Sequence, residues 1–88
     1  MVSYKIVYTK QAIKDIKKIQ ASKFEKKVKE LLEIIELNPF QTPPRYEKLI
    51  GDLQGAYSRR INIQHRLVYQ VFEIEKTIKI IRLWTHYE

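Results

Sequence analysis

The hydrophobic and polar residues of this 88-residue chain follow two different periods. Residues 4–8 form a short run rich in β-branched and aromatic side chains, which predicts a strand. Beyond that run, apolar residues recur every three or four positions as far as Leu37, a spacing typical of amphipathic helices. After Gly55 the apolar residues recur at short intervals again, which predicts strands. The pattern therefore divides the chain into an opening strand, a helical segment and a β-rich second half.

The helical segment is predicted to contain two helices. Thr9 can cap the first helix, and the lysines at positions 10, 14, 17 and 18 face largely outward. Ser22 and Glu25 form an S-x-x-E capping box that predicts the start of the second helix. Asn38-Pro39 ends that helix, because the residue before a proline disfavours helical geometry. The expected buried positions are Ala12, Ile13, Ile16 and Ile19 in the first helix, and Phe24, Val28, Leu31, Leu32 and Ile35 in the second.

The second half begins with a long connection and continues as three strands. Residues 39–55 contain three prolines, two glycines and no sustained period, and loops of this length are usually functional or disordered. Strands are expected at 56–63, 65–74 and 77–85, with a tight hairpin at Glu75-Lys76. The prediction is an α+β fold with the order β-α-α-β-β-β, in which a two-helix hairpin packs on one face of a mainly antiparallel sheet. Residues 1–88 are expected to form one domain.

Arginine is concentrated in the predicted strands, whereas lysine dominates the helices. Alternation along residues 56–63 places Ala56, Ser58 and Arg60 on one face, which we expect to be exposed to solvent, and Arg59 on the other. A charged sheet face can simply oppose aggregation. Lysine would do that equally well, whereas the planar guanidinium also binds phosphate through two hydrogen bonds and stacks on bases. The segregation of arginine therefore favours an RNA-binding surface. His65, Tyr69 and Trp84 are expected to be structural or interface residues.

The composition agrees with a nucleic-acid partner and excludes several classes. Seventeen basic residues against ten acidic ones give a net charge of +7, which attracts polyphosphate or an acidic protein. With no cysteines and only two histidines, neither a disulfide framework nor a zinc site is expected, and no cofactor is implied. No export signal and no apolar run of about 18 residues is present, so a cytoplasmic protein without a membrane partner is expected.

Several blocks, taken in order, carry a family likeness. They are Glu47-Lys48-Leu49, the run from Leu53 through Ser58-Arg59-Arg60-Ile61, then His65-Arg66-Leu67-Val68-Tyr69, and the closing His86-Tyr87, with Asn38-Pro39-Phe40 as the turn after the second helix. Together they resemble the YoeB/Txe toxins of bacterial type II toxin–antitoxin systems, within the RelE/ParE superfamily. The resemblance spans the whole chain.

The resemblance implies a ribosome-dependent mRNA endoribonuclease that cleaves the codon in the A site and inhibits translation. It also implies a cognate antitoxin partner, a homodimer and a toxin–antitoxin hetero-oligomer. The site residues follow from matching positions. Glu47 corresponds to the general base, Arg66 and Arg60 to phosphate-binding arginines, His86 to the general acid and Tyr87 to a terminal aromatic that helps hold the substrate. Lys48 and Arg59 are further candidates for substrate binding, although Arg59, on the alternate face, is expected to contact the antitoxin or a neighbouring element.

These residue types also suit the chemistry of RNA cleavage, an argument that does not depend on the resemblance. Attack by the RNA's own 2′-OH needs a base, a cation for the charge on the phosphoryl oxygens and an acid for the departing 5′-oxygen. A glutamate, arginines and a histidine with an ordinary pKa of about 6.5 supply these roles without a metal. The sequence departs from the family pattern at Ile50, where a lysine is common, and at Glu88, which follows the His-Tyr pair.

Two alternatives remain open on the same fold. One is a non-catalytic relative such as a ParE-like inhibitor of gyrase, although such relatives generally lack the Glu and terminal His-Tyr set. The other is an RNA-binding or ribosome-binding module whose arginines bind without cutting.

Overall fold

A computed structural model describes residues 3–49 and 55–84 of the chain. Its elements are β1 (Lys5–Tyr8), α1 (Lys10–Gln20), α2 (Glu25–Leu37), β2 (Tyr46–Lys48), β3 (Ala56–Arg60), β4 (Arg66–Phe72) and β5 (Thr77–Arg82). The five strands form one sheet in the order β1-β5-β4-β3-β2, in which β1 runs parallel to β5 and the other neighbours are antiparallel. The predicted α+β class is confirmed.

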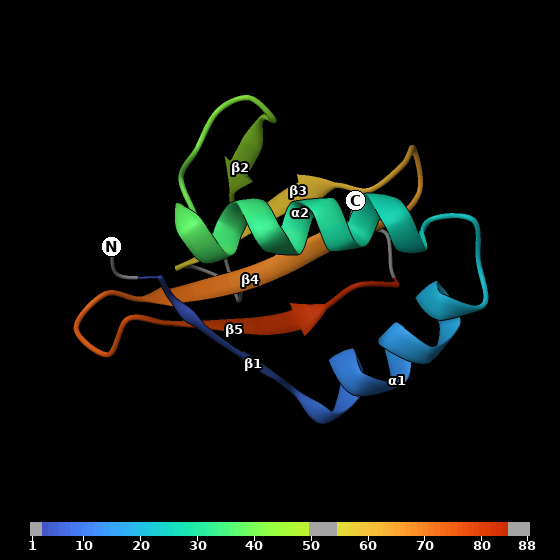
Figure 1. Cartoon of the computed structure of the whole chain (residues 1–88), viewed down its shortest axis with the longest axis horizontal. Helices are drawn as coiled ribbons and strands as arrows, with labels where there is room; N and C mark the ends of the chain where they lie inside the picture. The colour runs from blue at the N-terminus through green and yellow to red at the C-terminus, as the bar shows by residue number, and fades with distance from the viewer. Residues whose placement is uncertain (1–2, 50–54, 85–88) are drawn as a thin grey trace.

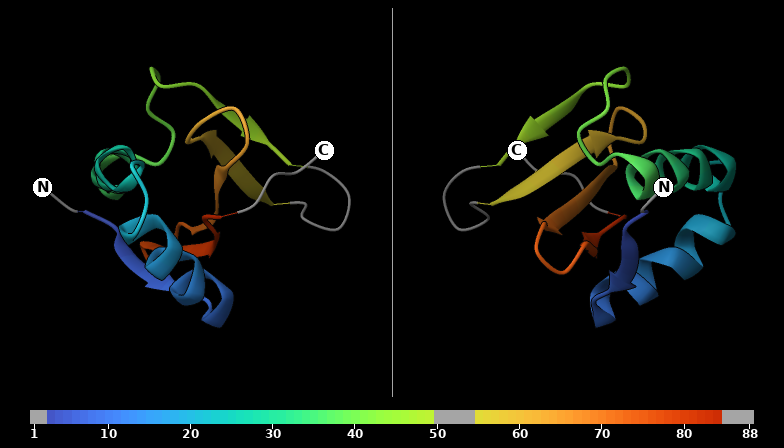
Figure 2. Two further views of the ribbon diagram at one scale, coloured as in Figure 1. Left: turned by 90° about the vertical axis from the view of Figure 1, so that its right-hand side faces the viewer. Right: turned by 60° about the vertical axis from the view of Figure 1, so that its left-hand side comes forward.

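Both helices pack on one face of the twisted sheet (Figure 1). Figure 2 shows the same layering from two other sides. The core between the layers contains Ala12 and Ile19 of α1, Val28, Leu31 and Ile35 of α2, and Leu67, Tyr69, Ile78 and Ile80 of the sheet. The apolar stripe predicted for the second helix is thus confirmed. In α1, Ile13 was predicted to be buried but is half exposed, whereas the carboxylate of Asp15 takes a buried position.

The starts of the two helices depend on different hydroxyl contacts. Thr9 caps α1 as expected, since its Oγ1 accepts a hydrogen bond from the Ala12 N–H at 3.0 Å. The capping box predicted at Ser22 is wrong: its Oγ accepts from the Phe24 N–H at 3.1 Å and donates to the Ile19 carbonyl, which makes a turn between the helices. Helix α2 therefore begins at Glu25 with Phe24 as its N-cap, without a side-chain cap.

The segment 39–55, expected to lack regular structure, contains the edge strand β2. Tyr46, Glu47 and Lys48 pair with Arg59, Ser58 and Tyr57 of β3. The ring of Tyr46 packs edge-on against Tyr57 and also contacts Phe40, with ring centroids 5.7 and 5.9 Å apart. Three residues are too few to show a period of two, so the strand depends on tertiary contacts such as this aromatic packing and the pairing with β3.

The remaining strands are shorter than expected and their hairpin is tight. Residues 73–76 connect β4 to β5, and Lys76 has a φ of 51° in this turn, which agrees with the predicted hairpin. The prediction that Ala56 and Ser58 face solvent is wrong, because both are buried, while Arg60 on the same side is exposed. Ser58 lies between the longer Glu47 and Val68 of the flanking strands, so a small side chain there sits below the surface.

Candidate functional site

The face of the sheet opposite the helices brings one carboxylate and two arginines together. Glu47 on β2 and Arg66 at the start of β4 reach across the intervening strand β3, and Glu47 Oε1 lies 3.3 Å from Arg66 Nη1. Arg60, the last residue of β3, is directly opposite Arg66 in the strand register. Three residues that the sequence places far apart therefore meet on neighbouring strands.

This ion pair contributes little to the fold. The Glu47 side chain is 49% exposed and that of Arg66 is 23% exposed. Solvent screens such pairs, which typically stabilise a protein by less than about 1 kcal/mol. Both side chains are nevertheless held at one place by the sheet register.

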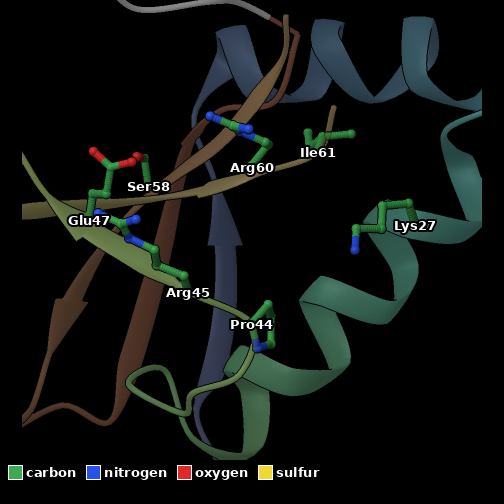
Figure 3. Close-up of a pocket in the computed structure, with 7 residues that line it drawn as sticks. All are labelled: Lys27, Pro44, Arg45, Glu47, Ser58, Arg60 and Ile61. Atoms are coloured by element: carbon green, nitrogen blue, oxygen red, sulfur yellow. The ribbon is translucent and has the colours of Figure 1, made fainter. Parts of the chain in front are cut away.

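A pocket of about 360 Å³ adjoins the pair and shares Glu47 with it. Figure 3 shows Glu47, Ser58 and Arg60 on adjacent strands, with Lys27 extending from α2. The lining is formed by Lys27, Pro44, Arg45, Glu47, Ser58, Arg60 and Ile61. The lining thus contains three cations and one carboxylate, so the pocket attracts anions. Sequence reasoning did not assign Lys27, Arg45 or Ser58 to the site.

Arg59 lies on the other side of β3 from Arg60 and is buried, with 1% exposure. Its Nε donates to the Tyr69 hydroxyl at 3.1 Å, and its two terminal nitrogens donate to the carbonyls of Pro44 and Pro39 at 2.7 and 2.9 Å. Its guanidinium also lies 5.1 Å from the centroid of the Tyr46 ring. Arg59 is therefore not accessible to a substrate, and the expectation that it binds substrate is wrong. The alternative expectation, a contact with a neighbouring element, is the one observed.

The Arg59 network positions the strand that carries Glu47. The Tyr69 hydroxyl donates to the Pro39 carbonyl at 2.7 Å. Burial raises the pKa of Tyr69 above its ordinary value, against the opposite effect of the Arg59 charge, so the hydroxyl stays protonated and remains a donor. Because Pro39 and Pro44 bracket the segment just before β2, these bonds fix the approach of β2 to the sheet.

Asp15 forms a second buried polar centre, which sequence reasoning missed. Its Oδ2 accepts hydrogen bonds from the N–H groups of Leu83 and Trp84 at 2.9 and 3.2 Å and from Arg82 Nε at 3.1 Å. Burial favours the neutral acid, but the hydrogen bonds from Leu83, Gln11, Trp84 and Arg82 outweigh it and hold the pKa of Asp15 below its usual value. The signal was available, since position 15 falls on the buried stripe of the first helix.

The other predicted residues take separate places. Lys48 is exposed but follows Glu47 on β2, so it projects to the alternate side of the strand. The ring of His65 stacks on Trp84 with centroids 4.0 Å apart, which supports the structural role expected for both. His86, Tyr87 and the departures Ile50 and Glu88 lie outside the described residues. Within the described ranges, neither helix is long and apolar enough to cross a membrane.

Comparisons with known proteins agree with this fold. Residues 8–87 match the family model described as the YoeB-like toxin of bacterial type II toxin–antitoxin systems. A protein named Toxin YoeB from Synechocystis sp. is 36% identical over 66 residues, which cover 75% of this chain and 74% of that protein.

Solved structures extend the similarity over nearly the whole chain. A YoeB/ParE toxin from Agrobacterium tumefaciens superposes with a TM-score of 0.86 at 30% identity, covering 94% of this chain and 99% of that one. The YoeB-YefM complex from Staphylococcus aureus gives a TM-score of 0.81 at 40% identity, covering 96% and 98%, and the YoeB dimer from that organism gives the same values. The fold is that of the RelE-like toxins. Within that class, the chain belongs to the YoeB-like toxins of bacterial type II toxin–antitoxin systems.

Proposed function

We propose that this toxin is a ribosome-dependent endoribonuclease that cleaves mRNA in the A site and thereby inhibits translation. The observation that carries the proposal is the contact between Glu47 and Arg66 on the sheet face opposite the helices, with Arg60 opposite Arg66. A carboxylate beside two guanidinium groups can take a proton from an RNA hydroxyl while the adjacent phosphate is neutralised.

The proposed reaction is an attack of the RNA 2′-oxygen on the adjacent phosphorus. Glu47 accepts the 2′-OH proton, and Arg66 and Arg60 stabilise the negative charge that grows on the non-bridging oxygens. The bond from phosphorus to the 5′-oxygen breaks, and His86 gives that oxygen a proton. The products are a 2′,3′-cyclic phosphate and a 5′-OH end. Tyr87 is assigned to holding the substrate, and a large part of the rate comes from positioning of the mRNA by the ribosome.

We further propose a cognate antitoxin as the partner, with a homodimer and a toxin–antitoxin hetero-oligomer as the assemblies. The S. aureus relative forms a complex with YefM and a dimer, which supports this proposal. With a net charge of +7, the toxin is most simply blocked by a chain that covers the arginine face with acidic and aromatic residues. Residues 1–88 would act as one domain in the cytoplasm, where ribosomes are found.

Translation in vitro, followed by primer extension on the mRNA, tests the catalytic proposal. The wild-type protein should cut inside the A-site codon, whereas Glu47→Gln and His86→Ala should each lower the cleavage rate by about 100-fold or more. Glu75→Gln, the same change in an exposed turn, is the control and should cut normally. Unbroken mRNA with stalled synthesis would instead support a non-catalytic binding module, and wild-type rates in both variants would refute the assigned roles.

A further inference from the structure

Ser58 is a buried hydroxyl that has no hydrogen-bond partner within the described parts of the chain. It is 1% exposed, and Ser58 is nevertheless one of the residues that line the pocket, together with Glu47 and Arg60 (Figure 3). Buried polar groups are almost always paired, because an unmade hydrogen bond leaves the cost of desolvation uncompensated. An unpaired hydroxyl at the wall of a pocket therefore indicates a ligand atom as its partner.

The charges around Ser58 indicate what kind of ligand this is. Lys27 on α2, Arg45 before β2 and Arg60 on β3 line the same pocket, and none of them forms an ion pair with another described residue. The one carboxylate in the lining, Glu47, is already engaged by Arg66. A pocket with three uncompensated cations and one available hydroxyl donor matches a phosphate group.

The position of the pocket relates it to the proposed reaction centre. Glu47 belongs both to the pair and to the pocket lining, and Arg60, which also lines the pocket, is opposite Arg66 in the register, so the pocket directly adjoins the Glu47–Arg66 pair. An RNA strand whose reacting phosphate lies at the pair can therefore pass its next phosphate toward Lys27 and Arg45. The pocket volume of about 360 Å³ exceeds that of a single phosphate and leaves room for the attached sugar.

We propose that this pocket is a second phosphate subsite for single-stranded RNA, in which Ser58 Oγ donates a hydrogen bond to a backbone phosphate next to the one that reacts. Lys27 and Arg45 supply its charge. This subsite rests on the proposed function, because it takes the same RNA strand, but it requires no cleavage. The assignment gives roles to three residues that the reaction itself leaves without one.

Folding and binding should respond in opposite ways to two serine substitutions. Ser58→Ala removes a hydroxyl that has no described partner, so the free energy of unfolding should stay the same or rise. Ser22→Ala removes a hydroxyl that bonds to the Ile19 carbonyl and the Phe24 N–H, so this matched control should lose stability while RNA binding stays normal. A purely structural Ser58 would give the reverse pattern, with reduced stability and unchanged binding.

The binding test uses the full chain and a single-stranded 2′-O-methyl oligoribonucleotide, which has no free 2′-OH and cannot be cut by the proposed reaction. Fluorescence anisotropy over a series of salt concentrations gives the affinity and its salt dependence. Ser58→Ala should weaken binding about tenfold, as expected for a hydrogen bond to a charged group. Lys27→Ala and Arg45→Ala should each lower the slope of log affinity against log salt by about 0.7. Lys14→Ala is the control for charge, because Lys14 is an exposed lysine of α1 outside the pocket. This substitution should leave the slope of log affinity against log salt unchanged.

The outcomes separate this subsite from the cleavage mechanism. The subsite is supported if the wild type binds the oligoribonucleotide and both Ser58→Ala and Lys27→Ala bind it more weakly. This holds even if the protein fails to cut mRNA on ribosomes. Equal binding by wild type, Ser58→Ala and Lys27→Ala, or no binding by the wild type, overturns the subsite while leaving the ribosome assay to judge cleavage.

Discussion

Arg59 and Arg60 are consecutive residues of β3, yet they belong to two different regions of the molecule. On the helix side, Arg59 is buried, and its guanidinium donates to a hydroxyl and two carbonyls. On the opposite side, Arg60 is exposed and lines a pocket next to the Glu47–Arg66 pair. A strand turns alternate side chains to opposite faces, so a shift of one position changes an arginine from a buried structural group into an exposed one that we propose binds the substrate. The number of arginines in a sheet therefore does not measure its capacity to bind RNA.

The largest effect on stability is expected from Arg59→Ala. The substitution leaves the Pro44 carbonyl without its described donor, weakens the Tyr69 centre and opens a cavity beneath β2. Losing one member of such a buried charged network costs about 3–5 kcal/mol in the free energy of unfolding. Urea denaturation measures this change. Arg60→Ala is the matched control and should stay within about 0.5 kcal/mol of the wild type, so a similar loss at both positions would remove the distinction between the two faces.

A smaller effect, with a pH signature, is expected from Asp15→Asn. The amide cannot replace all the hydrogen bonds from Leu83, Trp84 and Arg82, so we expect a loss of about 2 kcal/mol at neutral pH. Because the folded pKa of Asp15 lies below its ordinary value, its charge stabilises the fold above about pH 4. That contribution is lost as the pH falls through the lower folded value.

Urea unfolding from pH 7 to pH 2 tests this dependence. Asp15→Asn should show a smaller fall in stability on acidification than the wild type, since one carboxylate with a lowered pKa has been removed. Glu75→Gln makes the same change of charge in an exposed turn, and we expect its stability at neutral pH to stay within about 0.5 kcal/mol of the wild type. If the free energy of unfolding of Asp15→Asn fell on acidification as steeply as that of the wild type, the role given to Asp15 would be contradicted.

The smallest change in stability is expected on the face opposite the helices, from Glu47→Gln. The pair with Arg66 is partly exposed, so its loss should alter the free energy of unfolding by about 0.5 kcal/mol or less. Thermal unfolding of Glu47→Gln, Arg66→Ala and the double variant measures the coupling between the two side chains. A coupling of several kcal/mol would show that the pair holds the sheet together and would weaken its assignment to chemistry.

Sequence patterns predicted the helices and the long strands because each shows its period over several turns or residues. They did not reveal β2, since Tyr46–Lys48 is shorter than any detectable alternation and depends on pairing with β3. Asp15 escaped notice because its partners are backbone N–H groups at the far end of the chain, which no local pattern indicates.

The site was predicted unevenly for a similar reason. Glu47, Arg60 and Arg66 were assigned through family resemblance, and the structure places them together. Lys27 and Arg45 enter the pocket only because α2 and the segment before β2 meet beside the end of β3, which depends on tertiary packing. The burial of Arg59 could not be predicted from the alternation of side chains either. Alternation indicates that Arg59 and Arg60 lie on opposite faces, but it does not say which face the helices cover.

The central claim is that Arg59 supports the fold whereas the adjacent Arg60 takes part in the reaction. The same substitution at both positions tests this claim most directly. The measurement is the single-turnover rate of mRNA cleavage on ribosomes by Arg59→Lys and Arg60→Lys, at a temperature where both variants are folded. Lysine keeps the charge but loses the planar fork that binds phosphate through two hydrogen bonds. Arg60→Lys should cleave about tenfold or more slowly, whereas Arg59→Lys, which disturbs only the support of β2, should lose less of the cleavage rate and more of the stability. Equal rates in the two variants, or a slower Arg59→Lys, would contradict the division.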